Sequence, residues 1–180
     1  MTGGPHGKKV ALRPVEPEDH PLLRTWQNDP EVAHWMDYRL QFSLRDIEED
    51  QQRARRDGRP FVITLEDRPI GKCGLNQFRW EPRVCAMYVY IGDKQLWGQG
   101  LGRDAVMALL AVAFDECGLE RVELTMLADN SRAGHVYASC GFELEGRLAG
   151  RSYRGGVWHD TAIMSVPKDR FQAARAHYGI

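Results

Sequence analysis

The 180-residue sequence has no long apolar run, no clear excess of charge and no recognisable targeting segment. Its longest apolar stretch, residues 105–114, is about half as long as a membrane-spanning helix requires. Lysine and arginine (24) nearly balance aspartate and glutamate (25), so the net charge of −1 gives no general attraction to nucleic acid or anionic membrane. Residues 1–9 lack the apolar core of a secretion signal. We therefore expect a soluble, cytoplasmic protein with neither nucleic acid nor membrane as a partner.

The cysteines and histidines are not arranged for metal binding. The four cysteines are widely separated and form no Cys-x-x-Cys pair, and no two of the six histidines have the spacing of metal ligands. His159 and Asp160 are adjacent in a predicted strand, which directs neighbouring side chains to opposite faces. We therefore expect no metal site. The cysteines are interpreted as small buried side chains: Cys73, Cys85, Cys117 and Cys140.

Hydrophobic periodicity predicts one mixed α/β domain. No repeat or linker divides residues 1–180, so we expect a core of about residues 10–167, with tails at 1–8 and 168–180. The predicted order is strand, two helices, three strands, helix, strand, helix and two strands. The corresponding ranges are 10–14, 18–27, 43–58, 61–65, 69–78, 83–91, 101–117, 121–127, 130–141, 142–149 and 157–166. Because 83–91 is apolar on both faces, it should lie at the centre of a mostly antiparallel sheet of about seven strands flanked by helices.

A glycine-rich stretch, residues 95–102, lies between the predicted central strand and the helix that follows. Free N–H groups at a helix start, beside glycines, form a concavity suited to a pyrophosphate. A tight turn that only allows close packing would have the same spacing. No Gly-Lys-Ser/Thr follows, which disfavours a nucleoside-triphosphate hydrolase, and Arg103 stands where a dinucleotide-binding loop has its third glycine. A diphosphate ligand held by backbone alone remains.

Two sequence blocks resemble those of one family. Gln95-x-x-Gly98-x-Gly100 resembles the Gln/Arg-x-x-Gly-x-Gly/Ala signature of the GNAT superfamily, whose members transfer acyl groups from acyl-CoA to amines. The block from Asn130 through Ala133 and Tyr137 to Gly141-Phe142 is similar to the family's next segment. The two ends of the region from about 10 to 167 are similar to the RimJ/RimL and spermidine acetyltransferase branch. The resemblance implies a GNAT-like fold, acetyl-CoA as acyl donor and an N-acetyltransferase activity.

The same resemblance implies roles for particular residues. Val89, Tyr90 and Ile91 would pair their backbone with the pantetheine arm of the cofactor. Asn130 would hydrogen-bond near its thiol end, and Tyr137 would lie beside the sulfur. The pyrophosphate would be cradled by Trp97, Gly98, Gln99, Gly100, Leu101 and Gly102.

Acyl transfer to an amine needs a neutral amine, stabilisation of the developing oxyanion and a proton for the departing thiolate. A backbone N–H on the central strand can bind the oxyanion. Tyr137, whose hydroxyl has an ordinary pKa near 10, is the candidate acid, although its apolar helix face also suits a core tyrosine. Some relatives place a glutamate five residues before the Asn130 position, where this chain has Thr125. Glu123, on the same strand face, is the candidate base, and proton loss through water is the alternative.

The acceptor is not identified by the sequence. Trp35, Tyr38 and Phe42 either wall an acceptor pocket or pack in the core. Acids that could hold a cationic amine are Glu31, Asp37 and Asp160. A protein N-terminus and a small-molecule amine, such as a polyamine or an aminoglycoside, both remain candidates, and the sequence is compatible with a homodimer. The alternative function is a catalytically silent acyl-CoA-binding sensor or interaction module. Such a module would not need Tyr137 as a general acid.

Overall fold

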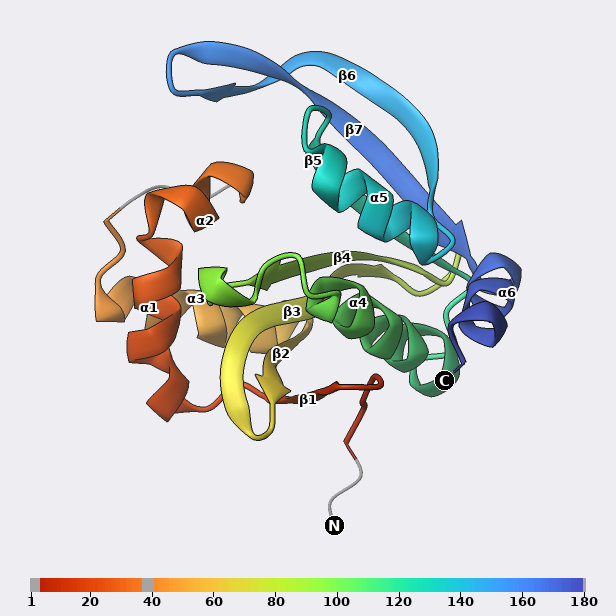
Figure 1. Cartoon of the computed structure of the whole chain (residues 1–180), viewed down its shortest axis with the longest axis horizontal. Helices are drawn as coiled ribbons and strands as arrows, with labels where there is room; N and C mark the ends of the chain where they lie inside the picture. The colour runs from red at the N-terminus through yellow and green to blue at the C-terminus, as the bar shows by residue number, and fades with distance from the viewer. Residues whose placement is uncertain (1–3, 37–40, 180) are drawn as a thin grey trace.

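A seven-stranded sheet runs through the molecule in the computed structural model, which describes residues 4–36 and 41–179. Its strand order is β1-β2-β3-β4-β5-β7-β6, and only the β4–β5 pair is parallel (Figure 1). The strands are β1 (Val10–Pro14), β2 (Arg59–Leu65), β3 (Arg68–Arg79), β4 (Val84–Ile91), β5 (Arg121–Leu127), β6 (Glu143–Arg154) and β7 (Val157–Pro167). The helices are α1 (His20–Gln27), α2 (Pro30–Trp35), α3 (Leu44–Asp57), α4 (Leu101–Ala111), α5 (Ser131–Ser139) and α6 (Lys168–Tyr178).

All the predicted strands and helices are present, in the predicted order, and β4 is central as its apolar faces indicated. Two helices were not predicted, α2 and α6. The prediction of a tail at 168–180 is wrong for α6, because Phe171 is buried at 1% exposure and stacks on Phe114 with ring centroids 5.0 Å apart. One aromatic anchor in an otherwise polar helix leaves too weak an apolar pattern to detect by periodicity.

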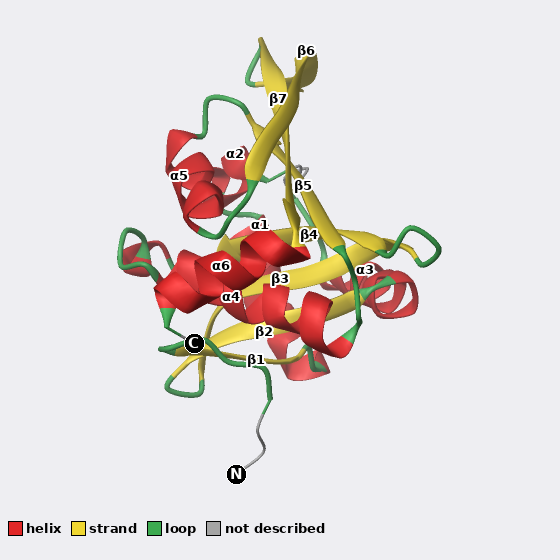
Figure 2. Cartoon of the chain, turned by 90° about the vertical axis from the view of Figure 1, so that its right-hand side faces the viewer, coloured by secondary structure: helices red, strands yellow, loops and turns green. Residues whose placement is uncertain are grey.

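Helices cover both faces of the sheet (Figure 2). The larger core lies on the α4 face and includes Cys73 and Cys85 from the strands. The smaller core joins Val62 and Tyr90 to α1, α2 and α3 on the opposite face. The alternation of side chains along β2 and β4 thus fills two separate cores. The expectation of buried cysteines is confirmed for Cys73, Cys85 and Cys140, whereas Cys117 is half-buried.

The sheet splits between β4 and β5. These strands pair over three positions only, from Val84↔Arg121 to Ala86↔Glu123. Beyond Ala86, β4 stays paired with β3, and beyond Glu123, β5 stays paired with β7. The two halves of the sheet consequently diverge, with β5 and β7 leaving the plane of β4 (Figure 1). This divergence creates a wedge-shaped opening at the middle of the sheet.

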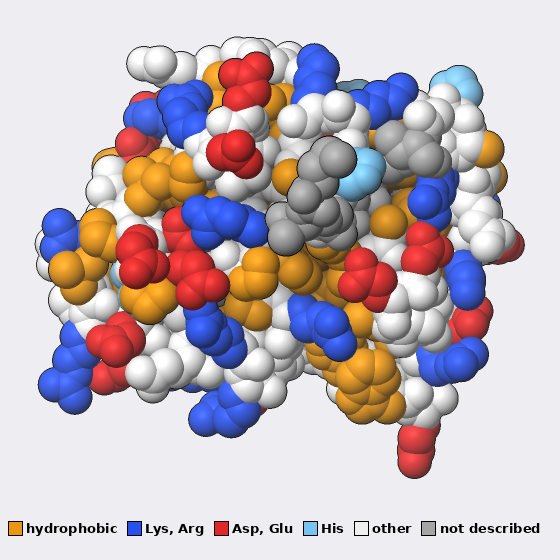
Figure 3. Space-filling model, turned by 90° about the horizontal axis from the view of Figure 1, so that it is seen from below, with side chains coloured by type: hydrophobic (Ala, Val, Ile, Leu, Met, Phe, Trp, Pro, Cys, Tyr) orange, Lys and Arg blue, Asp and Glu red, His pale blue; other side chains and the backbone are white. Residues whose placement is uncertain are grey.

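The outer surface carries charges of both signs, in keeping with the balanced composition. Basic and acidic side chains interleave over the face seen from below (Figure 3). Along α3, Arg45 pairs with Glu49 and Arg56 with Asp57, each at 2.9 Å. Within the described residues, no helix is both long enough and apolar enough to cross a membrane.

Asp104 joins the N-terminal segment to α4 and α6. Asp104 is only 1% exposed. Its carboxylate accepts hydrogen bonds from the amides of Lys8, Lys9 and Val10 at 2.7, 2.7 and 2.9 Å. The Tyr178 hydroxyl donates a fourth, at 2.8 Å. Burial alone would raise the pKa of Asp104, but these four donors outweigh it, so that its pKa lies below the ordinary value.

Asp104→Asn is expected to lower the free energy of unfolding by about 1–3 kcal/mol at pH 7, because the new amide places a donor against donors. The lowered pKa of Asp104 means that its contribution is fully present above the unfolded-state pKa, about 3.9, and is lost as pH falls through the folded-state pKa. Urea unfolding of both proteins at pH 7 and near pH 3 measures this. The difference in free energy of unfolding between the wild type and Asp104→Asn should be smaller near pH 3 than at pH 7. A difference that does not change with pH would contradict the role given to the ionised carboxylate.

Candidate functional site

A cavity of about 1020 Å³ lies where β4 and β5 separate. It extends from the start of α4, past α5, to α2 and the β6–β7 hairpin. Most of the predicted site residues line it together: Trp35, Val89, Tyr90, Ile91, Trp97, Gly98, Gly100, Leu101, Gly102, Glu123, Asn130 and Tyr137. Gln99 does not line it, because its side-chain amide folds back to donate to the Gln95 carbonyl at 3.0 Å. Tyr38 lies outside the described residues.

The glycine loop forms one end of the cavity. Gly98 and Gly100 have φ angles of +79° and +78°, a left-handed conformation that other residues rarely adopt. A Cβ atom built on Gly98, Gly100 or Gly102 would meet no atom within 4 Å, so the space in front of the loop is open. Gly100 is also the N-cap of α4, whose first N–H groups have no partner within the helix. Open space facing such N–H groups suits a phosphate.

The end of β4 forms one wall. Val89, Tyr90 and Ile91 pair with β3 on one side, and the register with β5 has already ended on the other. The Tyr90 side chain packs on the smaller core, edge-to-face with Trp26 at 6.4 Å. The Ile91 carbonyl accepts a hydrogen bond from Trp97 Nε1 at 2.8 Å. The Ile91 carbonyl is therefore already engaged, and Val89 is the residue of this wall that lies past the β4–β5 pairing with no such contact.

Asn130 and Tyr137 come from the opposite wall, α5. Asn130 caps this helix, with its Oδ1 accepting from the Ala133 amide at 3.1 Å, which leaves the Nδ2 group as a donor. Tyr137 is 9% exposed, and its ring packs against Phe142 with centroids 5.6 Å apart. Burial, with a smaller contribution from Cys140, raises the pKa of Tyr137 well above its ordinary value. Its hydroxyl therefore keeps its proton at neutral pH.

Glu123 lies at the point where the sheet splits. Arg79 Nη2 is 2.6 Å from Glu123 Oε2, and Arg121 Nε is 3.7 Å from Oε1. Both carboxylate oxygens thus face guanidinium groups. These two contacts leave further lone pairs of the carboxylate for an amine or for a bridging water, but the two guanidinium groups offset its negative charge.

The acceptor candidates separate in the structure. Trp35 is half-buried at the end of α2 and lines the cavity, whereas Phe42 packs against the smaller core. Glu31 pairs with Lys94 at 2.7 Å and is not part of the lining. Asp160 accepts from the Gly150 amide at 2.9 Å and also lies outside it. Asp37 lies outside the described residues.

Several polar side chains that the sequence did not single out also line the cavity. Arg132, in the first turn of α5, lies over the Trp97 ring at 4.4 Å. A cation in the first turn of a helix is disfavoured by the helix dipole, so Arg132 could have been recognised from the sequence as a candidate binding residue. Asn76 Oδ1 and the Tyr88 hydroxyl are buried with no hydrogen-bond partner within the described part of the chain. Their strand positions gave no signal, because alternation alone assigns them to a helix-covered face.

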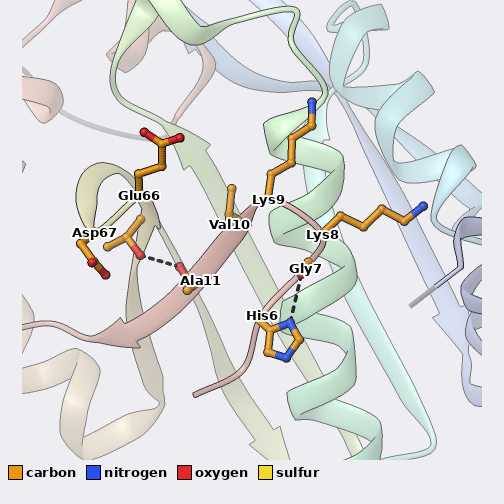
Figure 4. A pocket seen from close by; sticks show the side chains of 9 residues that line it. His6, Gly7, Lys8, Lys9, Val10, Ala11, Glu66 and Asp67 are labelled. Carbon is orange, nitrogen blue, oxygen red and sulfur yellow. Dashed lines mark hydrogen bonds between the residues drawn. The ribbon is translucent and has the colours of Figure 1, made fainter. Parts of the chain in front are cut away.

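A second hollow, of about 290 Å³, lies beside β1, away from these residues. It is lined by residues 6–11 with Thr64, Glu66 and Asp67. Figure 4 shows Glu66 and Asp67 on one side of the β1 backbone and Lys8 and Lys9 on the other. No predicted site residue lies in it, and the described residues contain no group of three or more His, Cys, Asp or Glu that could hold a metal ion. The larger cavity is therefore the candidate site.

Comparison with known proteins agrees with this geometry. Residues 9–143 match the family model described as acetyltransferase (GNAT) domain. The uncharacterized N-acetyltransferase p20 of Bacillus licheniformis is 23% identical over 171 residues, which cover 91% of this chain and 96% of that protein. The spermidine N(1)-acetyltransferase of Escherichia coli is 24% identical over 172 residues, covering 94% and 91% of the two chains.

A solved structure has the same fold. The spermidine N-acetyltransferase of Vibrio cholerae, in complex with CoA and spermine, superposes with a TM-score of 0.85 at 22% identity, over 91% of this chain and 98% of that one. This likeness extends over the sheet and its flanking helices, and it confirms the expected fold class.

Proposed function

The chain belongs to the acetyltransferase (GNAT) family, and from this premise we propose that it transfers the acetyl group of acetyl-CoA to a primary amine by direct attack in a ternary complex. One observation carries the proposal: a single cavity joins the glycine loop, the β4 edge and the Tyr137 hydroxyl. These three features correspond to the needs of the reaction for phosphate binding, thioester alignment and a proton donor.

Acetyl-CoA supplies an activated thioester. The open space before Gly98 and Gly100, with the first N–H groups of α4, fits its pyrophosphate without steric conflict. The backbone at the end of β4, from Val89 to Ile91, would bind the pantetheine arm as an added strand, since the register of β4 with β5 ends at Ala86. Asn130 would donate from Nδ2, because its Oδ1 is already used in capping α5.

Three groups of the chain would carry the chemistry. A β4 backbone N–H would donate to the oxygen that becomes negative as the amine attacks. Tyr137 would pass its hydroxyl proton to the departing sulfur, since the neutral phenol is its form at neutral pH. The amine must lose a proton in turn, and Glu123 would take it through water, because both of its oxygens face arginines.

We further propose that the chain lies near the spermidine and RimJ/RimL-like members of the family, that it works in the cytoplasm and that it forms a homodimer. A small-molecule amine is the primary acceptor in this proposal, and a protein N-terminal amine is the second. The alternative of a silent acyl-CoA-binding module is less well supported, because a pure binder would not need a proton donor in the cavity, where Tyr137 lies.

Thiol release from acetyl-CoA, followed across polyamines, amino acids, peptides and aminoglycosides, tests the proposed function. We expect release with at least one acceptor class, together with a rise in melting temperature on adding acetyl-CoA but not NAD. Acetyl-CoA binding without release on any amine would favour the binding module. Stabilisation by NAD alone would exclude the family's chemistry for this chain.

A further inference from the structure

The charged side chains that line the cavity are predominantly basic. Among the described residues, Glu123 is the only acidic side chain in the lining, and Arg79 and Arg121 already neutralise it. The basic ones are Arg103, Arg132, Arg151 and Arg154. This contrasts with the outer face, where the two signs interleave (Figure 3).

These arginines divide between the two ends of the cavity. Arg103 and Arg132 come from the first turns of α4 and α5, beside the glycine loop, where cofactor phosphates would bind. Arg151 and Arg154 come from β6, on the hairpin that reaches α2. Arg154 donates to the His34 and Met36 carbonyls, each at 2.6 Å, and so holds the hairpin against α2.

Arg151 is the charge that remains for an acceptor. Its side chain is exposed to the cavity and makes no hydrogen bond or ion pair with any described residue. Two of the three candidate acids are engaged elsewhere, Glu31 with Lys94 and Asp160 with the Gly150 amide, and the third, Asp37, lies outside the described residues. Among the described residues, an acceptor entering this end therefore meets a positive charge without a counterion.

Neutral polar atoms complete the same cavity. Asn76 Oδ1 and the Tyr88 hydroxyl are buried without partners among the described residues, and both residues line the cavity on the sheet side. A buried carbonyl oxygen without a donor is costly, and an amine N–H would satisfy it. Further ammonium groups, as in a polyamine, would find only Glu123 as a carboxylate among the described lining residues, already paired with two arginines, and would be repelled by Arg151.

Building on the proposed acetyl transfer, we propose that the acceptor is a primary amine that also bears an anionic group, a carboxylate or a phosphate, which Arg151 binds. Asn76 and Tyr88 stand in the sheet wall of the same cavity, and their buried polar atoms would have to turn toward it to hydrogen-bond the acceptor. Arg151 acts here as a specificity residue and takes no part in the proton transfers. The proposal distinguishes this chain's acceptor from the polyamine named for the Vibrio cholerae enzyme of the same fold.

The test measures kcat/KM for two matched acceptor pairs, alanine with alaninamide and phosphoethanolamine with ethanolamine, and for spermidine. Each pair differs in its anionic group, so the pairs separate a carboxylate source from a phosphate source. Arg151→Gln should lower kcat/KM about ten-fold for the anionic member of at least one pair, as expected for a lost charge-assisted hydrogen bond, and leave its neutral partner unchanged. Arg151→Lys should retain most of the activity, because it keeps the charge.

Arg147→Gln is the matched control. Arg147 lies on the same strand and is exposed, but it does not line the cavity, so its loss should change neither member of a pair. Equal losses on anionic and neutral acceptors in Arg151→Gln, or spermidine as the best acceptor of the wild type, would overturn the inference and leave the proposed function intact. Binding of acetyl-CoA without release from any of the five amines would overturn it as well, whereas failure to bind acetyl-CoA would overturn the proposed function.

Discussion

Gly100→Val is expected to abolish acetyl-CoA binding in a calorimetric titration. Gly100 has a φ of +78°, and its missing side chain leaves open space in front of the α4 N-terminus. An isopropyl group there would occupy the volume proposed for the pyrophosphate and cover the N–H groups that bind it. The substitution also strains the backbone by about 1–2 kcal/mol, so the loss of binding must be separated from a loss of folding.

Two variants make that separation. Gly118→Val introduces a comparable strain at a φ of +63°, also into open space, but Gly118 does not line the cavity. It should melt earlier than the wild type and still bind acetyl-CoA. Gly102→Asp places an anion in the first turn of α4, which favours the helix but repels a phosphate. Gly102→Asp should fold stably and fail to bind acetyl-CoA. Wild-type affinity for acetyl-CoA in both Gly100→Val and Gly102→Asp would refute the proposed phosphate site.

Tyr137→Phe is expected to lower turnover between about ten-fold and about 10⁴-fold, the span observed for one general acid. Phenylalanine keeps the ring contact with Phe142 and removes only the proton donor. Affinity for acetyl-CoA should therefore change little. Steady-state thiol release, with calorimetry of CoA binding, measures the two effects separately.

The control for this variant is Tyr178→Phe. It removes another phenol, one that donates to Asp104 at 2.8 Å and does not line the cavity, so it should lower stability and leave turnover unchanged. The raised pKa of Tyr137 also affects the pH dependence. Its hydroxyl should stay protonated up to and above pH 10, so ionisation of Tyr137 should cause no fall in turnover below pH 10. Wild-type turnover in Tyr137→Phe would exclude Tyr137 as the general acid.

Local sequence patterns predicted the elements best where one periodicity dominated. The strand at 121–127 was predicted to the residue, because its apolar side chains alternate. The helix at 101–117 was predicted as one piece, yet Val112–Glu116 forms a π turn, since an apolar surface suits either helix type. The first strand of the last hairpin, β6, ends at Arg154 rather than at residue 149. Its end was not predicted because the strand is exposed almost throughout and shows no alternation of buried and exposed residues.

The candidate site was predictable where one segment held all of its information. The glycine loop, the capping Asn130 and the position of Tyr137 on α5 each depend on neighbours within a few residues. Glu123 as a direct base was less predictable, since its partner Arg79 lies 44 residues away in sequence. Arg154 and the His34 carbonyl that it holds are 120 residues apart.

The sequence by itself therefore determined all the strands and four of the helices, which family the chain resembles and which segment is predicted to cradle a diphosphate, because these depend on local periodicity, capping and glycine conformation. Only the tertiary structure decided that β4 and β5 part after three pairs and that Arg151, which has no partner among the described residues, shares a cavity with Asn76 and Tyr88. These are juxtapositions of distant segments, set by how strands pair and helices pack. No periodicity within one segment encodes them.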